Sequence, residues 1–386
     1  MRRVPAALED KVEERLNEAL SQDIIERVEG PTKWLSPVVV VFKENGDIRL
    51  CIDMRRANTA ILRENYPLPT FDSFMTRLQG AMYFSRLDLK NAYHQLELDE
   101  DSRYITAFIT SKGIFRYKRL LFGVNSAPEL FQKTLENILA GCKCTLNYLD
   151  DVIVFGRTEV EHDENLKHVL DTFKTYNVTL NDGKCLLKVK ELKFLGHHLS
   201  TSGIMADPNK INCVLNFRAP NSKEEIHSFL GLVTYLGKFI PDLSDLVEPL
   251  RKLTKKDIKF SWGKEQEDSF KQLKERLHNT QTLSFFDPQR KTRLIADASP
   301  VALGAVLIQF DGDLPRVISF ASKTLSEVER RYSQTEKESL ALVWAVERFY
   351  YYLAGIEFEL ETDHKPLEAI FKPTSKPPAR IELWVL

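Results

Sequence analysis

The sequence predicts a mixed α/β (α+β) protein built from several lobes. Strand-forming apolar runs separated by turn residues are frequent up to about residue 155, a helical pattern covers 208–279, and a strand–helix–strand order follows Lys291. With 386 residues the chain is too long for one ordinary hydrophobic core. We therefore expect two or three domains.

The first predicted elements are a helix and a hairpin. Apolar residues at every fourth position after Pro5 predict an amphipathic helix that ends near Gly30. The runs 38–42 and 48–52 flank an Asn45-Gly46 turn, and Asn-Gly is the dipeptide that tight hairpins favour. A β-hairpin is therefore expected here.

Shorter elements follow as far as residue 155. A short helix should stop at Gly80, a strand should cover 82–88, and a strand pair should flank Gly113. Ser126 and Glu129 have the spacing of a capping box, so a helix should run to about Ile138. The segment 144–155 then reads as an apolar hairpin interrupted by two aspartates.

The second half of the chain divides into a helical region and a small α/β domain. A second capping box at Ser222 and Glu225 supports the helical region. After Lys291, the pattern predicts strands over 293–298 and 302–309, a long helix over 336–353, a strand over 357–362 and a proline-rich loop over 372–378.

Composition excludes several classes of protein. Hydrophobic residues at 43% and charged residues at 28% are typical of a globular protein and argue against disorder. The longest apolar runs are far too short to cross a bilayer, so no membrane partner is expected. Five scattered cysteines without a CxxC pair suggest neither a disulfide framework nor a zinc site. These features predict an intracellular protein.

The strongest chemical feature is Tyr148-Leu149-Asp150-Asp151 in the predicted hairpin. Solvated turn residues are one interpretation, but tight turns do not favour Asp-Asp, and two adjacent carboxylates repel each other. A divalent cation would relieve that repulsion. Asp88, at the end of the strand 82–88, could join Asp150 in holding two Mg²⁺ ions about 4 Å apart, the arrangement of nucleotidyl transfer.

Several motifs occur in one order that resembles the reverse transcriptase of gypsy-type long-terminal-repeat retrotransposons. The resemblance extends from Arg2 nearly to the last residue. Its motifs are 48–53 (IRLCID), 87–95 (LDLKNAYHQ), 122–128 (FGVNSAP) with Phe131-Gln132, 148–151 (YLDD) and 194–197 (FLGH). The chain departs from the family pattern at Leu121, where proline is common, and we expect little effect from this change of one apolar residue for another.

The resemblance implies a right-hand polymerase followed by a ribonuclease H-like domain. Fingers and palm would occupy 1–200, a helical thumb and connection 201–290, and the ribonuclease H-like domain 291–386. The family pattern calls for a fourth carboxylate beyond Leu386, so we expect this domain to be C-terminally truncated and to cleave hybrid RNA poorly or not at all.

The family also implies roles for individual residues. Asp88, Asp150, Asp151 and the Leu89 carbonyl would hold two Mg²⁺ ions, with Mn²⁺ as the alternative. Lys43 and Arg49 would neutralise the triphosphate, and Tyr93 would exclude a 2′-hydroxyl. Residues that would contact the primer and template are Phe122, Gly123, Pro128, Gln132, Phe194, Leu195 and Gly196. For the lysine and arginine the plainer interpretation is exposed hairpin charges, and for the aromatic residues it is core packing.

Three carboxylates in the C-terminal part resemble those of ribonuclease H. Asp297, Glu338 and Asp363 fall on a predicted strand, helix and strand end, from which they could converge on paired Mg²⁺ ions. The chemistry that this implies is hydrolysis of RNA in an RNA/DNA hybrid.

The predicted function is therefore RNA-directed DNA polymerisation on an RNA or DNA primer-template with deoxynucleoside triphosphates, in a cytoplasmic virus-like particle or the nucleus. One alternative is a decayed or host-adopted copy that binds nucleic acid without polymerising, against which the intact aspartates argue. Another is an RNA-dependent RNA polymerase, which Tyr93 and the ribonuclease H-like sequence disfavour.

Overall fold

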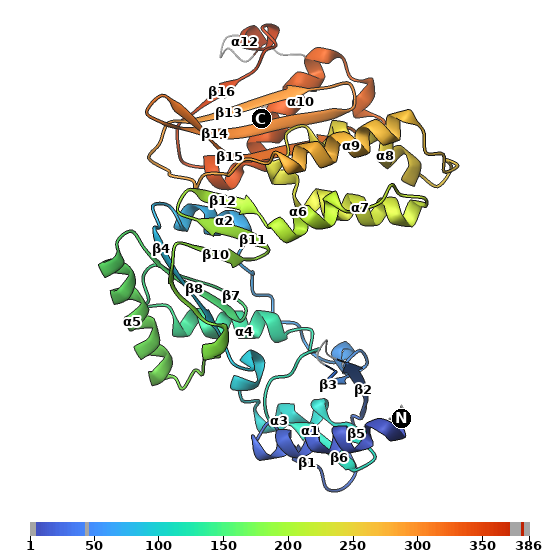
Figure 1. Ribbon diagram of the computed structural model, residues 1–386, viewed down its shortest axis with the longest axis vertical. Coiled ribbons are helices and arrows are strands. Elements are labelled where there is room, and N and C mark those ends of the chain that lie inside the picture. Colours follow the sequence, from blue (N-terminus) through green and yellow to red (C-terminus); the bar gives the residue numbers. More distant parts are fainter. Residues whose placement is uncertain (1–4, 43–45, 371–379, 382–386) are drawn as a thin grey trace. The chain divides into compact units, whose positions relative to one another are not determined.

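A computed structural model describes residues 5–42, 46–370 and 380–381 (Figure 1). The chain forms two compact units. The first consists of Met1–Pro69 and Phe84–Lys188, and the second of Thr70–Tyr83 and Val189–Leu386. Lys43 and the predicted loop 372–378 lie outside the described residues.

The first unit begins with helix α1 (Glu9–Ser21) and a five-stranded sheet. The sheet has the order β1-β6-β5-β2-β3, with bounds Ile25–Arg27, Gly113–Tyr117, Phe108–Thr110, Ser36–Phe42 and Ile48–Ile52. Val12 and Leu16 of the helix join Ile48, Phe108 and Phe115 of the sheet in one hydrophobic cluster. The predicted hairpin is confirmed, because β2 and β3 pair antiparallel from Val38↔Ile52 to Phe42↔Ile48.

The predicted end of the first helix is wrong. The helix stops at Ser21, Asp23 has a positive φ of 56°, and the next residues form β1. Ile25 pairs with Tyr117, which lies far along the chain. Such long-range pairing overrides the four-residue apolar spacing that extended the prediction to Gly30.

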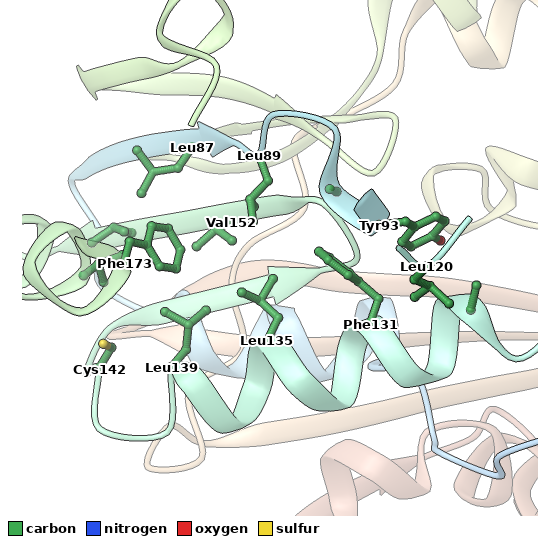
Figure 2. Packing of buried hydrophobic residues seen from close by; sticks show 14 residues of the cluster. Leu87, Leu89, Tyr93, Leu120, Phe131, Leu135, Leu139, Cys142, Val152 and Phe173 are labelled. Atoms are coloured by element: carbon green, nitrogen blue, oxygen red, sulfur yellow. The ribbon is translucent and has the colours of Figure 1, made fainter. Parts of the chain in front are cut away.

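The first unit also contains a four-stranded sheet, here called the hairpin sheet, in the order β7-β8-β4-β9. These strands are Thr145–Tyr148, Asp151–Gly156, Tyr83–Asp88 and Leu186–Val189. Helices α4 (Ala127–Ile138) and α5 (Glu159–Thr175) supply the apolar residues beneath it. Figure 2 shows Phe131, Leu135 and Leu139 from the α4 region facing Val152 of β8 and Leu89, which directly follows β4.

Helix α4 is confirmed, but its predicted capping box is wrong. Ser126 is already in the helical region of backbone space (φ −95°, ψ 0°) and makes no side-chain cap. The Glu129 carboxylate accepts hydrogen bonds from Arg63 instead, at 2.9 Å from Nε and 2.6 Å from Nη2. A distant arginine therefore binds the Glu129 carboxylate, which a capping box would need for the Ser126 backbone amide.

The second unit begins with α2 (Phe71–Arg77), which is the predicted short helix, and a three-stranded sheet. The predicted helical region is confirmed as α6 to α9. Ser222 accepts a hydrogen bond from the Glu225 amide at 3.2 Å, whereas the Glu225 carboxylate bonds to the Asn221 amide. The remaining bounds are β10 (Glu191–Phe194), β11 (His197–Ser200), β12 (Gly203–Ala206), α6 (Pro208–Leu215), α7 (Lys223–Tyr235), α8 (Leu243–Thr254) and α9 (Lys264–His278).

The chain then forms a C-terminal sheet in the order β15-β14-β13-β16. Strands β13 (Thr292–Ala298), β14 (Ala302–Asp311) and β16 (Phe358–Glu361) confirm three predicted strands, whereas β15 (Leu314–Thr324) was not predicted. The predicted long helix is divided into α10 (Gln334–Arg348) and α11 (Tyr350–Leu353), because Phe349 leaves the helical region (φ −102°, ψ 15°). Within the described ranges, no helix is long and apolar enough to cross a membrane.

Candidate active site

Adjacent strands of the hairpin sheet bring three aspartates together where the strands end. Asp88 is the last residue of β4, and Asp151 is the first residue of β8. The Leu89 amide donates a hydrogen bond of 3.4 Å to the carbonyl of Asp150, so the two loops that contain aspartates contact each other directly. Asp88 and Asp151 are half-buried and Asp150 is exposed.

The turn between β7 and β8 is strained and is supported by one buried glutamine. Leu149 has a positive φ of 52°, a conformation that costs a non-glycine residue roughly 1–2 kcal/mol. The Gln132 side chain accepts a hydrogen bond from the Leu149 amide at 2.7 Å and donates one to the Asn147 carbonyl at 3.1 Å. Gln132 was predicted to contact primer and template. In the structure it is fully buried against this hairpin.

The electrostatics of the three aspartates favour a cation. Burial raises the pKa of Asp151, and the charges of Asp150 and Asp88 raise it further, while Arg86 opposes them. Carboxylate oxygens are the hard donors that Mg²⁺ and Mn²⁺ accept, so the donor set fits a divalent ion. Within the described ranges, the carboxylate oxygens of Asp88, Asp150 and Asp151 are not as close together as those of Asp297, Glu338 and Asp363 in the second unit.

Aromatic residues and one arginine gather beside this site. The Tyr93 ring lies 4.6 Å from Phe122 and 5.2 Å from Phe131, measured between centroids, and is only 9% exposed. The Arg49 guanidinium lies 4.4 Å from the centroid of the Phe122 ring. Burial and then the charge of Asp150 raise the pKa of Tyr93. Tyr93 therefore packs in the core and also lies within the electrostatic field of the aspartates.

Two other residues predicted to contact the primer and template lie close to Phe122 in sequence. Gly123 has a φ of +97°, and a Cβ there would lie 3.6 Å from the Ile52 carbonyl oxygen. Pro128 occupies the first turn of α4. Both therefore shape the backbone of the segment that leads into this helix.

The predicted primer-terminus motif forms a tight hairpin turn in the second unit. Phe194 pairs with His197, and the two residues between them have positive φ angles, 47° for Leu195 and 68° for Gly196. The Tyr235 hydroxyl donates a hydrogen bond of 2.6 Å to the Leu195 carbonyl. A Cβ at Gly196 would lie 2.6 Å from both the Tyr235 hydroxyl and Lys210 Nζ. Glycine therefore suits this position, where a side chain would be strained and would displace the ends of Tyr235 and Lys210.

The C-terminal sheet and α10 bring together the other three predicted carboxylates, here called the trio. Asp297 lies on β13, Glu338 on α10 and Asp363 just beyond β16, and their ligand atoms lie within 4.8 Å of one another. Among the described residues, this is the one such group of histidine, cysteine, aspartate or glutamate.

Glu338 occupies the buried position of the trio. It is 4% exposed and accepts a hydrogen bond of 3.1 Å from the Ala298 amide. Its pKa is raised by burial and by the charges of Asp297 and Asp363. Oxygen donors under mutual repulsion fit a hard divalent cation such as Mg²⁺.

Sequence reasoning missed two supporting residues. Gln334 donates a hydrogen bond to the Glu338 carboxylate and another of 2.9 Å to the Ala298 carbonyl. Its spacing of four residues from Glu338 on one helix was a usable signal. Tyr235 reaches Leu195 across forty positions of sequence, and no local pattern indicates such a contact.

Comparison with known proteins finds two family matches along the chain. Residues 41–199 match the family described as Reverse transcriptase (RNA-dependent DNA polymerase), and residues 262–360 match the RNase H-like domain found in reverse transcriptase. The Retrovirus-related Pol polyprotein from transposon 297 of Drosophila melanogaster is 36% identical over 98% of this chain and 35% of the polyprotein. The Transposon Tf2-3 polyprotein of Schizosaccharomyces pombe is 33% identical over 99% of this chain and 29% of the polyprotein. The chain thus spans about a third of the length of these relatives.

Solved structures show the same fold. The foamy viral protease-reverse transcriptase in complex with dsDNA has a TM-score of 0.87 at 21% identity, over 100% of this chain and 81% of that chain. Its complex with RNA/DNA hybrid gives 0.82 at 20% identity, over 100% and 52%. The predicted fold of a polymerase followed by a ribonuclease H-like domain is confirmed. The chain belongs to the reverse transcriptase and RNase H-like region of retrotransposon Pol polyproteins.

Proposed function

We propose that this chain is an RNA-directed DNA polymerase that extends a primer on an RNA or DNA template. The observation that supports this most is the meeting of Asp88 with Asp150 and Asp151 on adjacent strands, within the segment that matches reverse transcriptases. The structural neighbours include reverse transcriptases in complex with dsDNA and with RNA/DNA hybrid, which supports nucleic acid duplexes as substrates.

The proposed step is attack of the primer 3′-oxygen on the α-phosphorus of a deoxynucleoside triphosphate, with loss of the 3′-hydroxyl proton and departure of pyrophosphate. Two Mg²⁺ ions held by Asp88, Asp150, Asp151 and the Leu89 carbonyl would activate the hydroxyl and neutralise the leaving group. Arg49 would bind the triphosphate through charge-assisted hydrogen bonds, and its contact with the Phe122 ring limits where the guanidinium can move. Tyr93 would occupy the space of a 2′-hydroxyl.

The proposed domains are fingers and palm over 1–200, a thumb and connection over 201–290, and the ribonuclease H-like domain from 291. The turn at Leu195 and Gly196 would contact the primer terminus. The hydrogen bond from the Tyr235 hydroxyl to the Leu195 carbonyl supports this role, because it holds the turn in one conformation.

Primer extension on an RNA template with Mg²⁺ and deoxynucleoside triphosphates tests the proposal. We expect template-dependent extension that is lost in Asp88→Asn. A folded chain that binds primer-template but never extends it would contradict the proposal and favour a nucleic-acid-binding role. Preference for ribonucleoside triphosphates would instead indicate an RNA polymerase.

The trio supports a second candidate function, which is metal-dependent hydrolysis of RNA in an RNA/DNA hybrid. The observation is the convergence of Asp297, Glu338 and Asp363 from three separate elements. Hydrolysis of labelled hybrid RNA with Mg²⁺ tests it, with Asp363→Asn as the control for contaminating nuclease. Cleavage that disappears in this variant would show that three carboxylates suffice. Absence of cleavage by the unmodified chain would contradict this second function.

A further inference from the structure

The chain that follows Asp88 is supported by a segment that no motif marks. Leu89 forms an isolated antiparallel bridge with Leu180, just beyond α5. The Lys90 amide donates to the Thr179 carbonyl at 3.0 Å, and the Asn181 amide donates to the Asp88 carbonyl at 2.8 Å. Residues 179–181 therefore act as a short extra strand against the residues that would bind metal.

This bridge determines where the backbone groups of Leu89 point. Its hydrogen bonds are made by the neighbours of Leu89 and Leu180, so these two residues form a non-hydrogen-bonded pair. The amide and carbonyl of Leu89 consequently face away from Leu180, and the amide reaches Asp150. The Leu89 carbonyl therefore lies on the side where the metal ligands gather.

Gln95 holds this bridge together through all of its side-chain hydrogen-bonding atoms. Its Oε1 accepts from the Thr179 amide at 2.9 Å, and its Nε2 donates to the Thr179 carbonyl at 3.0 Å. The same Nε2 also donates to the Lys90 carbonyl at 2.7 Å. The side-chain amide thus pairs with Thr179 as a backbone amide of a third strand would.

The backbone between Lys90 and Gln95 needs such support. Asn91 has a positive φ of 51°, and a 3-10 helix follows it over Ala92–Gln95. The bond from Nε2 to the Lys90 carbonyl closes this loop across the left-handed residue. Without this hydrogen bond, the short loop would lose a contact that holds its backbone where it leaves Asp88 and Leu89.

We infer that Gln95 is a positioning residue of the polymerase site, which sets the Asp88 and Leu89 ligands through residues 179–181. This inference rests on the proposed polymerase function. Residues that orient metal ligands from outside the coordination sphere change metal affinity or activity by about tenfold to a hundredfold when they are removed. The expected consequence is a higher Mg²⁺ requirement.

The test variant is Gln95→Met, which keeps the length of the side chain and removes its polar atoms. A cavity of about 60 Å³, lined partly by Gln95, Leu96 and Val178, lies beside the side chain and can accept the methionine. The Mg²⁺ concentration for half-maximal primer extension should rise about tenfold or more, with unchanged primer-template affinity. Gln95→Glu should behave similarly, because a carboxylate would face two carbonyl oxygens.

Gln309→Met is the matched control. Gln309 accepts from the Asp287 amide at 2.9 Å and donates to the Asp287 carbonyl at 2.7 Å, the same pairing in the second unit. It should lower the melting temperature without changing the Mg²⁺ requirement. If Gln95→Met melts lower but keeps the wild-type Mg²⁺ requirement, Gln95 is only structural and the inference is wrong. Failure of the unmodified chain to extend would contradict the proposed function instead.

Discussion

The two candidate metal sites place their carboxylates in opposite ways. In the hairpin sheet, Asp150 lies in a turn, and Asp88 and Asp151 lie at the ends of strands. In the C-terminal domain, Asp297 lies within a strand and Glu338 within a helix, and the carboxylates of the trio already lie within 4.8 Å of one another. The first site thus lies where strands meet loops, and the second lies mainly within regular secondary structure.

This difference explains where side-chain support is needed. In the trio, strand pairing fixes Asp297, and the Glu338 carboxylate accepts a hydrogen bond directly from the Ala298 amide. The loops of the hairpin sheet have the short Leu89–Leu180 bridge in place of a long ladder, and Gln132 and Gln95 add side-chain bonds to their backbone. A loop-borne site can adjust when substrate and metal bind, but its geometry depends on residues that never touch either of them.

The largest expected effect is separation of the two activities. Asp150→Asn should reduce primer extension at least about a hundredfold, because it removes a charged ligand while keeping its size. Primer-template affinity and the properties of the trio should not change. Asp171→Asn, on the exposed face of α5, is the control. Loss of both extension and primer-template binding would indicate misfolding and would contradict the expected separation of the two sites.

Removal of the support beneath the turn should have the next largest effect. Gln132→Met leaves the Leu149 amide without its buried acceptor, which should lower the free energy of unfolding by about 1–3 kcal/mol. Extension should fall by about tenfold or more, since the turn contains a proposed metal ligand. Chemical denaturation and steady-state extension measure the two effects. Equal activity losses in Gln132→Met and Gln309→Met would show that only general stability matters.

A smaller effect is expected on sugar selectivity. Tyr93→Ala should raise the use of ribonucleotides relative to deoxynucleotides by about tenfold, because exclusion by the ring is steric. Loss of the contacts with Phe122 and Phe131 should also reduce stability. Tyr93→Phe keeps the ring and should keep the selectivity. An unchanged ratio in an active Tyr93→Ala protein would leave Tyr93 as a packing residue.

The smallest expected effect is on the pH dependence of stability. The pKa of Glu338 is raised above its ordinary value of 4.5 in the folded protein, so the native state keeps this proton longer than the unfolded state. Stability should therefore decrease as pH rises from about 4.5 through the raised pKa. Glu338→Gln should weaken the dependence of the melting temperature on pH in this range. Glu265→Gln, exposed on α9, should leave this dependence unchanged. A steeper decrease in Glu338→Gln would contradict the repulsion within the trio.

Local patterns predicted much of the fold. The strand pair 38–42 and 48–52, the hairpin of 144–155 and the strands β13, β14 and β16 each have a signal within a few residues, and the structure confirms them. Asn45 of the first predicted turn lies outside the described residues. The same patterns placed Asp150 in the turn of the 144–155 hairpin and Asp151 beside it, at the start of β8. Their assignment as metal ligands stays a prediction.

The elements that were missed depend on distant partners. The first helix ends early because β1 pairs with β6, and the Ser126 cap fails because Arg63 binds Glu129. Helix α5 has no chemical motif, and residues 179–181 become a strand only against Leu89. Gln95 lay within a recognised motif, but its contact with Thr179 spans 84 positions, which no periodicity can indicate.

The turn at Leu195 and Gly196 has a consequence for how this sequence can change over generations. At Leu195 the strain comes only from the left-handed backbone, so asparagine or glycine would relieve it, and copies with these residues should survive. At Gly196 the backbone is also left-handed, and a side chain would in addition have to displace the Tyr235 hydroxyl and Lys210. In a library of random substitutions selected for function, position 195 should therefore accept more residues than position 196.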